Sequence, residues 1–161
     1  MTIRIFTFLF LIFLISCKKP EKPVNKFIGI WYDTEYIIPG KSSIKINKDS
    51  TFNYSSAGCD WRVFSKGNWK IIGDSIELSS VKIDTCYFAF SFLDCAFFDR
   101  RGKKPLVTIP NCEADGRKDF CIFSNETFYL RNDSLVYKIK TSSKCPDTLK
   151  IIFARTEKIR K

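Results

Sequence analysis

The residues best suited to chemistry in this chain are its seven cysteines, because the sequence contains no histidine. Without histidine the usual acid–base catalyst is missing, and there is neither a Gly-x-Ser-x-Gly motif nor a glycine-rich phosphate loop. Asp33 and Glu35 could pair at i, i+2, but nothing in the sequence marks them as desolvated. No two cysteines form a C-x-x-C pair, so their spacing favours neither a zinc site nor a thioredoxin-like centre. We expect no enzyme activity, no metal and no cofactor.

Residues 1–16 have the composition of a secretory signal peptide. Arg4 precedes an apolar run from Ile5 to Ile15 that only Thr7 interrupts. The alternative is a transmembrane helix, which needs about 20 apolar residues. This run is shorter and is followed at once by Cys17 and two lysines. The pattern therefore predicts export.

The end of this run, Leu14-Ile15-Ser16-Cys17, resembles the lipobox of bacterial lipoproteins. The resemblance implies that the signal is removed and that Cys17 becomes an N-terminus carrying several acyl chains, which stable anchoring requires. Lys18 then occupies the second position. By resemblance to the sorting rule of enteric bacteria, this favours the outer membrane. We expect a lipid-anchored cell-envelope protein, with the periplasmic face and the cell surface both open.

Residues 17–26 are charged and interrupted by proline, which predicts an extended tether between the lipid anchor and a folded domain at 27–156. Residues 157–161 form a basic tail. The formal net charge of the chain is +10. Most cations alternate singly with apolar residues, which favours a solvated exterior over a binding patch. No nucleic-acid-binding signature accompanies them, so we expect no nucleic-acid partner.

An even number of cysteines follows Cys17, which in an exported chain predicts disulfide bonds. They are Cys59, Cys86, Cys95, Cys112, Cys121 and Cys145. Cys112 and Cys121 flank Asp115-Gly116, which can reverse the chain, and they are the best candidate pair. The segment between Cys86 and Cys95 has no turn former and, if extended, holds these two roughly 30 Å apart. We expect them to bond elsewhere, with the remaining pairing open.

Apolar and polar residues alternate through most of 27–156, which predicts β-strands. Hairpins are expected around Lys48-Asp49-Ser50, Gly73-Asp74 and Asn132-Asp133, with a break between Leu78 and Val81. Residues 86–98 are rich in aromatics and suit a buried strand or a short helix, and 106–109 read as a short strand. We predict a single all-β domain, an antiparallel up-and-down barrel or meander of about eight to ten strands.

Two Gly-x-Trp triplets, Gly29-Ile30-Trp31 and Gly67-Asn68-Trp69, stand at similar points of their strands. With the hairpin at 44–52 and the Gly73-Asp74 turn, they resemble lipocalin-like lipoproteins of Gram-negative bacteria over roughly residues 27–80, with 126–155 compatible. The resemblance implies that Trp31 and Trp69 close a barrel and that Arg155 packs on Trp31. Glycine would let the backbone bend at a barrel corner. Alternatively, Trp31, Trp61 and Trp69 are ordinary core aromatics.

Two functions follow from these features. In the first, the domain holds a small apolar or amphipathic ligand near the membrane. Against this, the 16 phenylalanines would simply fill the barrel. In the second, a disulfide-braced module docks other envelope proteins through its outer face or loops 99–120. The contact residues would then be Arg100, Arg101, Lys103 and Lys104.

Overall fold

The computed structural model describes residues 25–35, 40–93, 95, 105–146 and 148–157. These contain an 11-stranded sheet. The strands are β1 (Gly29–Glu35), β2 (Lys41–Ile46), β3 (Thr51–Ala57), β4 (Arg62–Ile72), β5 (Ser75–Ser80), β6 (Phe88–Ser91), β7 (Leu106–Val107), β8 (Asp119–Ile122), β9 (Glu126–Arg131), β10 (Ser134–Tyr137) and β11 (Ile152–Ala154). No helix suited to crossing a membrane occurs in this described part of the chain.

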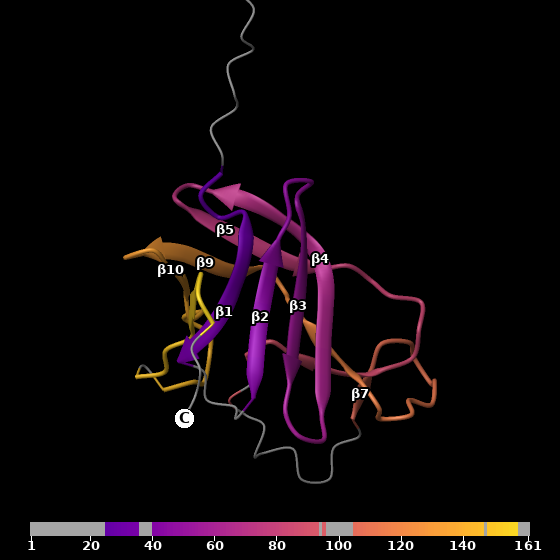
Figure 1. Ribbon diagram of the computed structural model, residues 1–161. Coiled ribbons are helices and arrows are strands. Elements are labelled where there is room, and N and C mark those ends of the chain that lie inside the picture. Colours follow the sequence, from indigo (N-terminus) through magenta and orange to yellow (C-terminus); the bar gives the residue numbers. More distant parts are fainter. Residues whose placement is uncertain (1–24, 36–39, 94, 96–104, 147, 158–161) are drawn as a thin grey trace, which may run out of the picture.

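Eight strands form a closed antiparallel barrel in the order β3-β2-β1-β11-β10-β9-β5-β4, with β4 pairing back to β3 (Figure 1). Strands that follow one another along the chain are neighbours in the barrel, so its connectivity is up-and-down. The predicted all-β fold is confirmed. Of the two predicted forms, a barrel or a meander, the structure has the barrel. The predicted turns at Gly73 and at Asn132-Asp133 adopt positive φ angles, as tight hairpins require.

The two ends of the barrel differ. We call one end the base: here β1 begins beside the end of β2, and the β2–β3, β4–β5 and β9–β10 turns gather. We call the other end the mouth, where β2 begins, β9 begins at Glu126 and β10 ends at Tyr137. The chain enters the barrel at the base, at the top of Figure 1.

Residues 81–125 form an insertion between β5 and β9 that adds β8, β6 and β7 outside the barrel beside β4. β8 pairs in parallel with both β4 and β6, whereas β7 is antiparallel to β6. The aromatic stretch left open between strand and helix forms β6 over Phe88–Ser91, and β5 ends at Ser80 near the expected break. The alternation in the sequence did not predict the parallel pairing.

The core fills the inside of the barrel because every second residue of each strand points inward. Fully buried apolar side chains come from seven of the eight barrel strands: Trp31, Ile44, Ile46, Phe52, Ile76, Leu78, Phe128, Leu135 and Phe153. The core is therefore continuous from one wall of the barrel to the other.

Candidate functional site

The base is capped by Trp31 and Arg155. The guanidinium carbon of Arg155 lies 3.6 Å from the Trp31 ring centroid, and its two terminal nitrogens donate hydrogen bonds to the carbonyl oxygens of Ile28 (2.8 Å) and Lys26 (2.6 Å). The Trp31 indole N–H donates to the Phe27 carbonyl at 2.7 Å. Arg155 thus stacks on the Trp31 ring and binds two carbonyl oxygens of the segment before β1. These contacts fix that segment against the end of the last strand.

Trp69 lies at the same end but not in the same contact. Its indole N–H donates to the Asn47 carbonyl at 3.0 Å and so ties β4 to the β2–β3 turn. The structure thus joins Trp31 with Arg155 and leaves Trp69 as a separate buried residue. All three side chains lie at the base.

The two Gly-x-Trp glycines are needed for different reasons. Gly29 has φ 131°, a conformation that favours glycine, and a Cβ atom there would overlap the Arg155 guanidinium. Gly67 has no positive φ; a Cβ atom there would overlap the Ser79 carbonyl oxygen and the Phe52 ring. Bending of the backbone at a barrel corner was the expected role of these glycines; at Gly67 the structure shows that close packing also requires glycine.

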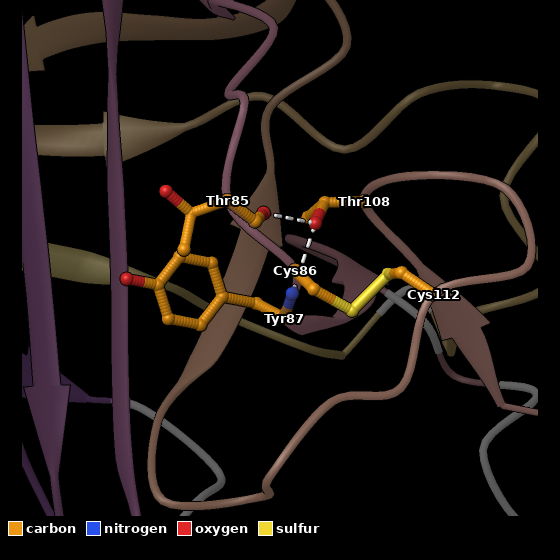
Figure 2. The surroundings of a disulfide bond; sticks show 5 residues. All are labelled: Thr85, Cys86, Tyr87, Thr108 and Cys112. Carbon is orange, nitrogen blue, oxygen red and sulfur yellow. Dashed lines mark hydrogen bonds between the residues drawn. A yellow bond between two sulfur atoms is a disulfide. The ribbon is translucent and has the colours of Figure 1, made fainter.

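The predicted Cys112–Cys121 disulfide is wrong. Cys112 bonds to Cys86, and Cys95 bonds to Cys145. The β6–β7 pairing brings the Cys86 and Cys112 regions together, and the Thr108 hydroxyl donates to the Thr85 carbonyl and accepts from the Tyr87 N–H (Figure 2). Cys121 instead lies on β8, buried in the core with its pKa raised by burial. The expectation that Cys86 and Cys95 bond elsewhere is confirmed.

Among the residues that the structure describes, two thiols are free: Cys59 on the surface and Cys121 in the core. We expect a maleimide to label Cys59 quickly in the folded chain carrying Cys17→Ser, and Cys121 only after unfolding, because a buried thiol is neither accessible nor ionised. Mass spectrometry after labelling with and without denaturant measures both. A Cys59→Ser chain that still takes up label while folded would contradict the burial of Cys121.

Phe92 lies across the lumen, on the mouth side. Its ring centroid is 5.7 Å from that of Tyr54 on β3 and 5.3 Å from that of Tyr137 on β10, strands on opposite sides of the barrel. Phe123, at the end of the insertion, lies 4.4 Å from Phe92 and 5.1 Å from Phe52. Phe92 is only 3% exposed. The insertion therefore supplies two rings that fill the lumen between mouth and base.

Buried polar side chains line the inside of the mouth. They are Asp33, Ser42, Ser56, Ser65 and Glu126. The hydroxyls of Ser42 and Ser56 are 2.6 Å apart, and the Ser65 hydroxyl is 2.8 Å from that of Ser80, so these serines satisfy one another across paired strands. The lumen thus changes from apolar at the base to polar at the mouth.

Glu126 is the most elaborately bound of these groups and is 4% exposed. Its Oε2 accepts a hydrogen bond from the Tyr137 hydroxyl at 2.5 Å, and its Oε1 lies 2.7 Å from the Lys140 ammonium. Burial raises the pKa of Tyr137, and so do its hydrogen bond to Glu126 and the negative charge of Glu126. Lys140 also donates to the Ser124 carbonyl at 2.6 Å. A buried carboxylate with these partners holds the lysine in one position.

A hollow of about 270 Å³, which we call the rim hollow, lies beside this network. It is lined by Ser91, Leu93, Cys95, Ser124, Glu126, Tyr137, Lys140, Ser142, Ser143 and Lys144. Since Glu126 offsets one lysine, the hollow has an excess of positive charge among several hydroxyl groups. It fits a small anionic group.

Sequence reasoning did not identify Glu126, Tyr137 or Lys140. The sequence did contain a signal for Glu126. It lies two residues before Phe128 in the same strand, so its side chain points to the same, inner side of the barrel. An inward charge in a barrel strand indicates a bound partner for that charge.

Several predicted features lie outside the described residues. These are Cys17 and the signal peptide, the tether up to residue 24, the basic residues Arg100, Arg101, Lys103 and Lys104, and the tail from 158. Among the described residues no group of three or more His, Cys, Asp or Glu could hold a metal ion.

No family model, curated protein or solved structure matches the chain. Its class is therefore defined by its own architecture. It is a disulfide-braced, eight-stranded up-and-down β-barrel, consistent with a lipocalin-like fold.

Proposed function

We propose that this protein is a lipid-anchored envelope protein whose barrel docks other envelope components and does not carry a ligand in its lumen. The observation that carries the proposal is the packing of Phe92 and Phe123 against Tyr54, Phe128 and Tyr137. These rings occupy the space in which a carrier barrel would hold an apolar molecule. Anchoring at Cys17 is supported by the sequence at 14–17, and two disulfides fit an exported chain.

The docking surface proposed is the mouth. The rim hollow presents Lys140, held by Glu126, together with Lys144. An acidic side chain or a carboxyl terminus of a partner fits this surface, because an oriented ammonium loses little conformational freedom on binding.

Native mass spectrometry of the mature chain, before and after denaturation, tests the filled lumen. We expect no lipid-sized molecule to leave the wild-type protein on unfolding. Phe92→Ala should open a cavity that binds a small apolar molecule such as benzene, as dry engineered cavities do. Phe92→Leu, which largely refills the space, is the matched control. A lipid released from the wild-type protein would overturn the proposal and restore the carrier function.

Charge reversal tests the docking surface. Lys140→Glu with Lys144→Glu should abolish cross-linking to envelope partners in cells, whereas Lys48→Glu at the base should not. Cys17→Ser should remove the acyl mass and release the chain from membranes. Equal cross-linking by the mouth and base variants would argue against docking at the mouth.

A small organic anion is the second candidate, favoured by the excess positive charge of the rim hollow. Calorimetry with short-chain carboxylates would detect it. Binding that is lost in Lys144→Ala, together with cross-linking that survives Lys140→Glu with Lys144→Glu, would assign the hollow to a small molecule rather than to a protein.

A further inference from the structure

The β4–β5 hairpin projects past the base with an apolar tip. β4 has 11 residues, and its last three, Lys70 to Ile72, are all exposed. Ile71 is 57% and Ile72 45% exposed, although both are large and apolar. Two adjacent exposed isoleucines at a hairpin tip cost solubility unless another surface covers them.

This tip lies at the end of the barrel where the chain enters. Gly29 at the start of β1 pairs with Ile46, beside the β2–β3 turn, and Thr51 after that turn pairs with Asn68 near the end of β4. Figure 1 shows the start of β1 and the β4–β5 hairpin at the same end of the molecule. Whatever holds the N-terminal segment therefore holds the base close to it.

The chain outside the structure limits how far the base can move from a membrane. At about 3.4 Å per residue, residues 17–25 span at most about 27 Å. A barrel strand of seven residues is itself about 23 Å long. An anchor at Cys17 keeps the base near the lipid, whereas the mouth could reach the same surface only with the tether stretched along the whole barrel.

Charge at the base is mixed. The charged side chains near its turns are Lys26, Lys48, Asp49, Lys70, Asp74, Glu77, Arg131 and Asp133, and Lys70 pairs with Glu77 at 2.9 Å. The tether adds three cations, Lys18, Lys19 and Lys22, and one anion, Glu21. The base thus contains no large excess of acid that anionic headgroups would repel, and the tether supplies cations that attract them.

We propose that the base rests on the membrane that holds the anchor, with Ile71 and Ile72 inserted among the lipid headgroups. The inference rests on the proposed anchoring at Cys17. Apolar side chains inserted at this depth add to the acyl chains and fix the orientation of the barrel. The mouth and its rim hollow then face away from the membrane, toward partners.

Nitroxide labels on the lipidated mature chain test the orientation in vesicles of phosphatidylethanolamine and phosphatidylglycerol. One label is placed at Ile72→Cys and a matched one at Leu106→Cys, both in Cys59→Ser. Leu106 is 54% exposed but lies on β7, away from the base. We expect the label at 72 to collide more with oxygen and less with a water-soluble nickel chelate than the label at 106. Equal accessibility of the two labels to oxygen and to the nickel chelate in vesicle-bound protein would overturn this inference and leave the proposed function standing.

A second measurement separates the hairpin from the anchor. In the mature chain with Cys17→Ser, Ile71→Ser with Ile72→Ser should lower partition into the same vesicles at least about tenfold, since each isoleucine loses its apolar burial. An unchanged partition would also overturn the inference. A mature chain that carries no acyl mass would overturn the anchored function and the inference with it.

Discussion

Trp31→Ala should lower the free energy of unfolding by about 3–5 kcal/mol, among the largest effects of any single substitution in this chain. Trp31 is fully buried at the base, bonded through its indole N–H to Phe27 and covered by the Arg155 guanidinium. Its removal leaves a cavity at the point where the first and last strands meet, and Arg155 loses the ring on which it stacks. Urea unfolding followed by circular dichroism measures the loss.

Trp31→Phe is the control, because it keeps most of the apolar volume and removes only the indole N–H. We expect it to cost about 1–2 kcal/mol, the range of one buried hydrogen bond plus a small packing defect. A loss below about 1 kcal/mol for Trp31→Ala would show that this tryptophan does not close the barrel.

Removal of the Cys95–Cys145 disulfide should cost about 4 kcal/mol in the double variant Cys95→Ser, Cys145→Ser. The bond closes a loop with a sequence separation of 50, and loop-closure entropy of that length corresponds to this magnitude. It also joins the insertion, three residues after Phe92 in the chain, to the segment after β10. We therefore expect faster amide exchange at residues 91–93 as well as lower stability, measured by hydrogen exchange and urea unfolding.

The second disulfide provides the matched comparison. Cys86–Cys112 has a sequence separation of 26, and both cysteines lie in the insertion. Its removal should cost a similar free energy, about 3.5 kcal/mol, but leave exchange at Phe92 unchanged. Equal exchange at residues 91–93 in both double variants would show that Cys95–Cys145 does not hold the aromatic plug.

The sequence predicted the barrel well because its signals are local. Alternation places Ile44, Phe52 and Leu78 inward, and turn residues such as Gly73 fix where each strand reverses. The Gly-x-Trp resemblance implied that Trp31 and Trp69 close the barrel, and the structure places both at its base.

Features that depend on contacts distant in sequence were not predictable in the same way. Disulfide pairing was missed because spacing suggested a local turn at Asp115-Gly116, whereas pairing follows from the packing of the insertion beside β4. The positions of Phe92 and Phe123 in the lumen depend on the same packing. Glu126 is the exception, since its inward position could be read from the alternation.

The pairing of the first barrel strand with the last one determines when the fold can be completed. The Thr34 hydroxyl donates to the Ile152 carbonyl, 118 residues later, and β11 has three residues. Until β11 has paired with β1 and β10, each of these two strands has an unpaired edge to which another strand can add. Because Arg155 follows β11 directly, closing the sheet and capping Trp31 become one step. The last ten described residues thus convert an aggregation-prone open sheet into a barrel without free edges.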